Sequence, residues 1–207
     1  MILDMKTMML MYATVNVLCA LVMVLVWHRN RKHFAGISFW LIDMVLQAGG
    51  ATLILLRGLV PDFISMVVAN TMIMGGIVII YIGLERFVGK RSSQIHNYVL
   101  LAVFVSILTY FALIQPGLLA RNLNIALMTA IFTFQCYWLM VHRVAPDVRQ
   151  MTRGVGIVFG AYVAISVIRT ILFLIFPPQS SDFFKSGMFD TMIIMLYILL
   201  AVGLLWA

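Results

Sequence analysis

Long runs of hydrophobic residues alternate with short polar segments along almost the whole chain. Seven runs hold few charged side chains, at residues 8–27, 37–56, 63–86, 98–114, 118–141, 154–176 and 188–206. A helix rises about 1.5 Å per residue and the hydrocarbon core of a bilayer is about 30 Å thick, so about 20 apolar residues cross it. The pattern therefore predicts seven transmembrane segments, of which the fourth is the shortest.

Helix is the secondary structure that these runs predict. Backbone polar groups inside a bilayer must bond within their own segment or within a closed barrel, and the runs lack the alternating pattern of barrel strands. The longest loop, at residues 177–187, is too short for a folded domain outside the membrane. The sequence therefore predicts an all-α membrane protein in which residues 1–207 form a single seven-transmembrane helix bundle.

Basic residues gather on alternate loops, which predicts the orientation of the bundle. The composition is 64% hydrophobic and 10% charged with a mean hydropathy of +1.09, so the net charge of +7 first needs a membrane explanation. The basic clusters follow the first, third and fifth runs: Arg29, Arg31, Lys32; Arg86, Lys90, Arg91; Arg143, Arg149, Arg153. Because cytoplasmic loops carry the excess of lysine and arginine, we expect the N-terminus outside and the C-terminus in the cytoplasm. No basic patch interleaved with aromatics indicates a nucleic-acid partner.

Metal and cofactor chemistry finds little support in the sequence. The four histidines fall at the cytoplasmic ends of the runs, whereas haem or metal ligation in a bundle uses histidines that face each other within the core. The last run has no lysine for a retinal Schiff base, and the two cysteines lie within runs, where a thiol usually packs as a small apolar group. We expect no metal and no cofactor.

Polar residues at membrane depth are the strongest candidates for function, because they are costly to insert and normally face the bundle interior or a wet cavity. Counted by helical rise, several lie near the outer ends of five helices. Positions 162, 166 and 169 are spaced so that their side chains lie on one face of the sixth predicted helix. The candidate ligand-binding residues are Tyr12, Asn16, Asn70, Asn124, Tyr162, Ser166, Arg169 and Asp190.

Arg169 and Asp190 make the most specific contact prediction. Arginine is the costliest member of the set, and Asp190 is the one acidic side chain near its depth. Two interpretations stay open: a structural one, in which the pair and the asparagines hold the bundle together, and a functional one, in which they line an outward pocket for an anionic small molecule or lipid. Arg57 and Arg121 on the same side favour an anion over a cation.

Two other features concern packing and charge on the inner side. Gly156 and Gly160 are four residues apart, which permits close helix approach within the bundle or between protomers, and we expect the former. Asp43 shares a helix face with Gln47 and lies toward the basic loops, so we expect an arginine or lysine to neutralise it. A proton relay through Asp43 is the alternative, but a relay needs further ionisable groups across the midplane.

Three segments carry a family resemblance: 57–62 (RGLVPD), 69–71 (ANT) and 81–89 (YIGLERFVG). With their spacing, the chain resembles the amino-terminal seven-helix membrane region of bacterial signalling proteins, especially GGDEF-type diguanylate cyclases and some sensor histidine kinases. In such proteins the last helix leads into a cytoplasmic coiled coil and output domain. The resemblance thus implies a sensor module of the bacterial inner membrane, with an output domain outside this chain and dimeric output if the parent is a cyclase. It carries over no catalytic residue.

The sequence is compatible with three functions. The first is a sensor that binds a ligand, or responds to a property of the lipid bilayer, and moves the last helix. The alternative is a small-molecule transporter or channel, although midplane helix breaks and clear internal repeats are missing. An intramembrane enzyme is the third, and no cluster of nucleophile, base or metal ligands at one depth supports it. We expect the sensor, with no enzymatic activity in this chain.

Overall fold

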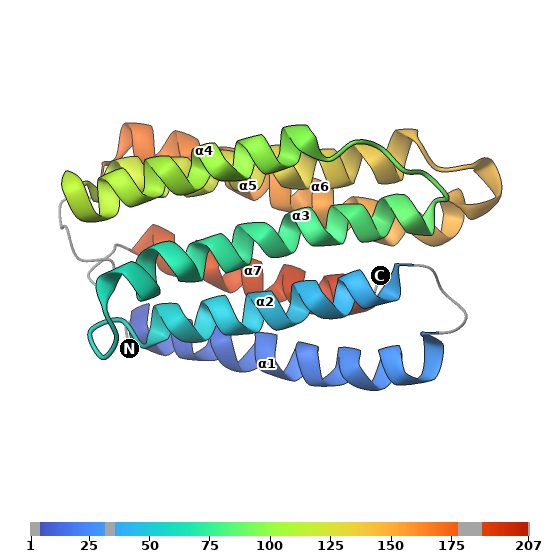
Figure 1. The fold of residues 1–207 in the computed structure, drawn as a ribbon, viewed down its shortest axis with the longest axis horizontal. Coiled ribbons are helices and arrows are strands. Elements are labelled where there is room, and N and C mark those ends of the chain that lie inside the picture. Colours follow the sequence, from blue (N-terminus) through green and yellow to red (C-terminus); the bar gives the residue numbers. More distant parts are fainter. Residues whose placement is uncertain (1–4, 32–35, 178–187, 207) are drawn as a thin grey trace.

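The computed structural model describes residues 5–31, 36–177 and 188–206 (Figure 1). These residues form seven helical spans and no named strand. The bounds are α1 Met5–Asn30, α2 Ile37–Leu55, η1 Phe63–Val68 leading into α3 Ala69–Phe87, α4 Ile95–Thr109 leading into η2 Tyr110–Ile114, α5 Leu118–His142, α6 Pro146–Ile175 and α7 Met188–Trp206. The segments η1 and η2 are π-helical.

All seven spans are long and apolar enough to cross a membrane, which confirms the predicted fold class. Several helices run past the apolar residues that predicted them. The largest difference is in α6, which begins eight residues before the predicted position 154. Ala145 is extended and Pro146 stands in the first turn, where its fixed φ favours helix and its missing N–H costs nothing. Hydropathy locates the membrane-spanning part of a helix, and capping residues locate its end.

Successive helices run in opposite directions along one long axis (Figure 1). We call the end of the bundle at which α1, η1, α5 and α7 begin the N-terminal end, and the other, where α7 finishes, the C-terminal end. Packing closes six helices into a ring in the order α1, α2, α3, α5, α6, α7 and back to α1. Helix α4 lies outside this ring against α3 and α5.

The ring is not uniform. The contacts of α2 with α1 and α3, and of α5 with α6, are far more extensive than those at the other seams. Two tightly packed blocks, α1–α3 and α5–α6, therefore face each other. Helix α4 covers one seam between them, and α7 closes the other by packing on α1 and α6. Helix α7 is thus joined to the rest of the ring by modest contacts on both sides.

Small residues allow the close approach within the blocks. A Cβ added at Gly160 would lie 3.2 Å from the ring of Tyr137, and one at Gly156 would lie 3.3 Å from Val141, both on α5. The expected intramolecular packing of this glycine pair is confirmed. Gly36 has a φ of +98°, and a Cβ added there would lie 2.5 Å from the carbonyl oxygen of Gly83. The start of α2 and the end of α3 therefore meet almost backbone to backbone.

Large apolar side chains cover the outside of the bundle as well as its core. Leu25, Ile157 and Leu174 on α1 and α6 are 67%, 63% and 66% exposed. A soluble monomer rarely exposes apolar surface on this scale, whereas a lipid-facing surface requires it. The outer surface therefore agrees with a multi-pass membrane protein.

Candidate functional site: an arginine-lined cavity inside the helix ring

A cavity of about 160 Å³ lies inside the ring. Each of the six ring helices contributes to its wall, and Leu108 of α4 closes the seam between α3 and α5. Much of the wall is apolar, including Met9, Met74 and Ile77. Such a volume is comparable to engineered cavities that admit a benzene-sized molecule and is smaller than the sites of drug-sized ligands. The cavity therefore has room for a small organic molecule.

Three arginines from three helices line this cavity. Arg57 follows the last turn of α2, Arg121 lies in the first turn of α5 and Arg169 lies near the end of α6. All three positions belong to the N-terminal end of the bundle. Arg121 and Arg169 are only 7% and 8% exposed. Buried guanidinium groups are stable only with anionic partners or good acceptors, so this group of arginines is the dominant electrostatic feature of the site.

The partners of Arg121 are weak for a buried cation. Its Nη1 points to the sulfur of Met66 at 2.8 Å, and its buried Nε has no hydrogen-bond partner. Met66 belongs to the π-helical segment η1, and the carboxyl of Asp62, just before that segment, adds a favourable charge. A thioether is a poor acceptor, and Asp62 is exposed to solvent. Arg121 therefore retains most of its capacity to bind an anion.

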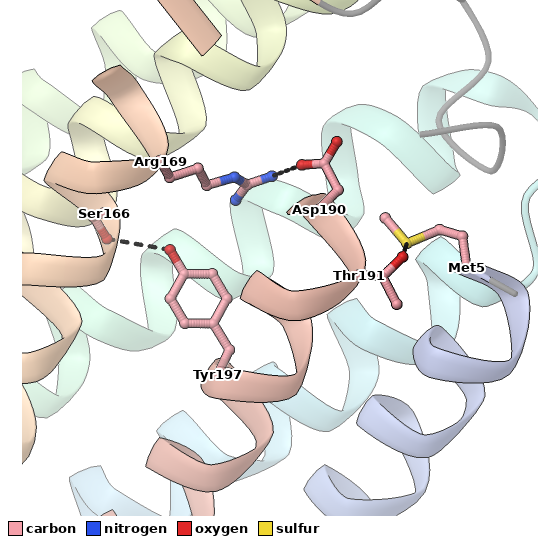
Figure 2. A network of polar contacts seen from close by, with 6 residues as sticks. All are labelled: Met5, Ser166, Arg169, Asp190, Thr191 and Tyr197. Carbon is pink, nitrogen blue, oxygen red and sulfur yellow. Dashed lines mark hydrogen bonds and ion pairs between the residues drawn. The ribbon is translucent and has the colours of Figure 1, made fainter. Parts of the chain in front are cut away.

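Arg169 and Asp190 form the ion pair that the sequence predicts. Nη2 of Arg169 lies 3.8 Å from Oδ1 of Asp190, and the two side chains are 10% and 9% exposed (Figure 2). The guanidinium also lies over the ring of Phe173, with 5.2 Å to the centroid. A separation of 3.8 Å is an ion pair without a close hydrogen bond. The pair therefore joins α6 to the first turn of α7 through charge rather than through a close hydrogen bond.

Two further contacts join α7 to its neighbours. The hydroxyl groups of Ser166 on α6 and Tyr197 on α7 are 3.2 Å apart (Figure 2). At the start of α7, the hydroxyl of Thr191 points to the sulfur of Met5 on α1 at 4.0 Å (Figure 2). Polar contacts thus hold α7 on both sides, and those to α6 are the stronger.

Five of the eight residues predicted from sequence line the cavity: Tyr12, Asn16, Asn70, Tyr162 and Arg169. The other three lie around it. Asp190 and Ser166 hold α7 as described, and Asn124 donates from Nδ2 to the carbonyl oxygen of Phe104 on α4 at 3.0 Å. Asn124 therefore tethers α4 to the ring.

The polar residues predicted near the outer ends of the helices lie at different distances from those ends. Asn16 is 11 residues from the start of α1, at a depth of about 16 Å, whereas Asp190 is two residues from the start of α7. The reason is that α1 begins at Met5, three residues earlier than its hydropathy indicates. Asn16 and Asn70 also donate to carbonyls of their own helices, Tyr12 O at 2.8 Å and Met66 O at 2.6 Å. The five members of the set that line the cavity therefore lie at different levels along the bundle.

Asp43 is the main residue of the cavity wall that the sequence placed wrongly. It is 3% exposed and lines the cavity, and the described residues bring no Lys, Arg or His within ion-pair distance of it. Its Oδ1 accepts from Nε2 of Gln47 at 3.1 Å, and Nε2 also contacts the carbonyl oxygen of Ile73 at 3.2 Å. Asp43 points into the ring beside Gly76, away from the basic loops.

Sequence reasoning also missed Tyr197, which lines the cavity and stacks on Tyr162 with 5.6 Å between ring centroids. A tyrosine on the most apolar helix was the available signal. A second buried carboxylate, Glu85, accepts from Ser92 and Gln94 and so joins α3 to α4 outside the cavity. In the described ranges, no three His, Cys, Asp or Glu side chains form a group that could hold a metal ion.

The site and the fold together define a seven-helix membrane protein with a polar cavity inside its helix ring. Comparison of the chain with family models, curated proteins and solved structures gives no match.

Proposed function

We propose that this chain is a membrane-embedded sensor module whose cavity binds a small organic anion at the arginine end and relays binding through α7. The observation that carries the proposal is the convergence of Arg57, Arg121 and Arg169 on one cavity, with Arg169 also paired to α7. In the orientation predicted by the basic loops, the arginine end faces outside. The module would lie in a bacterial inner membrane, with α7 leading to an output domain on the cytoplasmic side.

Charge balance supports an anionic ligand. Among the described residues, three guanidinium groups at the N-terminal end have two carboxyls at the same end, Asp190 and the exposed Asp62. A carboxylate or phosphate group would accept charge-assisted hydrogen bonds from Arg121 and its neighbours and would compensate part of their desolvation. The cavity volume suits one such group on a short carbon skeleton. A lipid headgroup would present the same chemistry, with its chains outside the ring.

The relay follows from the pairing of Arg169. An anion at the arginine end competes with Asp190 for this guanidinium and so weakens a contact between α6 and α7. Helix α7 has modest packing on both sides, which makes it the element of the ring with the least resistance to displacement. Coupling energies between sites are typically about 1–3 kcal/mol, and the pairwise energy expected for contacting charged residues is about 0.5–3 kcal/mol, which is of that size.

The binding test uses octanoate as the probe, measured by isothermal titration calorimetry on the full chain in detergent micelles. We expect saturable binding that Arg121→Gln weakens by at least about tenfold, the equivalent of about 1.4 kcal/mol. Arg143→Gln is the matched control, because Arg143 is exposed at the C-terminal end and does not line the cavity. Equal affinity in Arg121→Gln and Arg143→Gln would show that the arginine end is not an anion site.

The relay is tested by pulsed electron paramagnetic resonance with spin labels at positions 25 and 199, which are exposed on α1 and α7. The buried Cys19 and Cys136 are first replaced by alanine. We expect octanoate to change the distance distribution between the labels, and Arg169→Ala to abolish that change. A distribution unaffected by octanoate at saturation would exclude α7 as the relay.

A transporter or channel is the second candidate, and the extent of the cavity favours it. The wall reaches from Arg57 at the N-terminal end to Leu204, two residues before the end of α7. The cavity would need to extend only a short distance beyond Leu204 to form a path across the bundle. Uptake of labelled octanoate into proteoliposomes separates the two functions, since a sensor binds octanoate without moving it across the bilayer.

A further inference from the structure

We propose that the inner part of the cavity is a binding site for an organic ammonium group, with Asp43 as its counter-ion. This inference extends the proposed function, because it makes the ligand a dipolar molecule with an anion at the arginine end and an ammonium group about 10 Å deeper. It rests on Asp43, on three tyrosines and on the depth between the two groups.

Asp43 is a buried carboxyl group that faces the cavity and has no basic side chain within ion-pair distance among the described residues. It is 3% exposed, it faces the cavity and its described polar partner is the amide of Gln47. A neutral amide compensates a buried carboxylate only in part, and buried charges are normally paired. Gly76 maintains the arrangement, because a Cβ there would lie 2.5 Å from Oδ1 of Asp43. The chain therefore keeps space for this carboxyl group within the ring.

Aromatic rings contribute to the wall of the cavity that Asp43 faces. Tyr12, Tyr162 and Tyr197 all line the same cavity, and the last two stack on each other. An ammonium group is attracted both to a carboxylate and to the faces of tyrosine rings. Asp43 with these three tyrosines forms what we call the Asp43 pocket.

The separation of the two groups sets the length of the ligand. Arg121 contacts Met66 and Asp43 contacts Gly76, so the two levels are ten residues apart along one span, or about 15 Å. Charge-assisted contacts take up about 2.8 Å at each end and leave roughly 9–10 Å between the charges of the ligand. A linear ω-amino carboxylate with eight carbons has this length when extended and suits the narrow volume of the cavity.

Three matched probes test the inference: octylamine, octanoate and 8-aminooctanoate, titrated calorimetrically into the full chain in micelles at constant ionic strength. We expect 8-aminooctanoate to bind at least about tenfold more tightly than either single-charge probe. Asp43→Asn should abolish octylamine binding and reduce 8-aminooctanoate to the affinity of octanoate. Asp62→Asn, an exposed carboxyl that does not line the cavity, is the control for octylamine and should leave its affinity unchanged.

The unfolding stability of each variant is measured in the same micelles. A second pair of variants, at Tyr162, tests the site independently in case Asp43→Asn does not fold. Tyr162→Phe keeps the aromatic ring and should retain octylamine binding, whereas Tyr162→Leu should lose it. Unchanged octylamine affinity in Asp43→Asn and in Tyr162→Leu would overturn the ammonium site. Loss of octylamine binding when Na⁺ replaces K⁺ would assign the Asp43 pocket to a metal cation and overturn the inference as well.

The outcomes separate the two proposals. Octanoate binding that depends on Arg121, with no octylamine binding, would leave the anion site standing and refute the ammonium site. Octylamine binding that depends on Asp43, with no octanoate binding, would do the reverse. Binding of 8-aminooctanoate that depends on both residues supports one ligand bridging both ends of the cavity.

Discussion

The ion pair between Arg169 and Asp190 gives the most quantitative prediction. The charges are 3.8 Å apart and both side chains are about nine-tenths buried. Coulomb's law gives an attraction of about 4 kcal/mol at an effective dielectric constant of about 20, before desolvation is subtracted. Removal of one member of a buried pair typically costs about 3–5 kcal/mol, because the other charge stays buried without it. We therefore expect Arg169→Met and Asp190→Leu each to destabilise the bundle by about 3 kcal/mol.

A double-mutant cycle isolates the pair from the other contacts of both residues. The double variant, Arg169→Met with Asp190→Leu, leaves neither charge of this pair buried without its partner. Its loss of stability should therefore be about 2 kcal/mol smaller than the sum of the two single losses. Unfolding is followed by circular dichroism during titration with sodium dodecyl sulfate in mixed micelles. A parallel cycle of Arg169→Met with Asp62→Asn should be additive. A coupling below about 0.5 kcal/mol in the first cycle would refute the ion pair as a link between α6 and α7.

Three packing predictions follow from individual contacts. Gly76→Ala should destabilise the bundle by about 1–3 kcal/mol and weaken octylamine binding, because the added methyl displaces Asp43, whereas Gly75→Ala meets nothing within 4 Å and should be harmless in the same assays. Gly36→Ala should cost more than Gly58→Ala in melting temperature, because both have positive φ but only Gly36 also faces the Gly83 carbonyl at 2.5 Å. Asn124→Ala should cost about 1–2 kcal/mol and increase hydrogen exchange in α4, since it removes the donor to Phe104; equal exchange in wild type and variant would count against the tether.

The local character of each segment was readable from the sequence. Mean hydropathy and run length predicted all seven spans, because each spanning helix must satisfy its own backbone and face lipid independently of its neighbours. The contact of Arg169 with Asp190 was also predictable, since one cation and one anion at similar depth leave few alternatives. Both inferences depend only on position along a helix.

The identity of the cavity wall depended on helix order in the ring. Asn124 and Asn122 are two residues apart on α5, yet Asn122 lines the cavity and Asn124 faces α4, because α4 lies outside the ring. Asp43 looked adjacent to basic loops along the sequence, but the packing of α2 against α3 turns it to Gly76 and into the cavity. Which face of a helix points inward is decided by packing with helices that are distant in sequence.

The sequence by itself therefore determined the number, length and membrane character of the helices, which local chemistry controls. Only the tertiary structure decided that six helices enclose a cavity, that three arginines line one end of it and that Asp43 faces the same space. These features arise from interhelical packing, where glycines permit close approach at a few points and ring closure by α7 brings α1 and α6 around a common space.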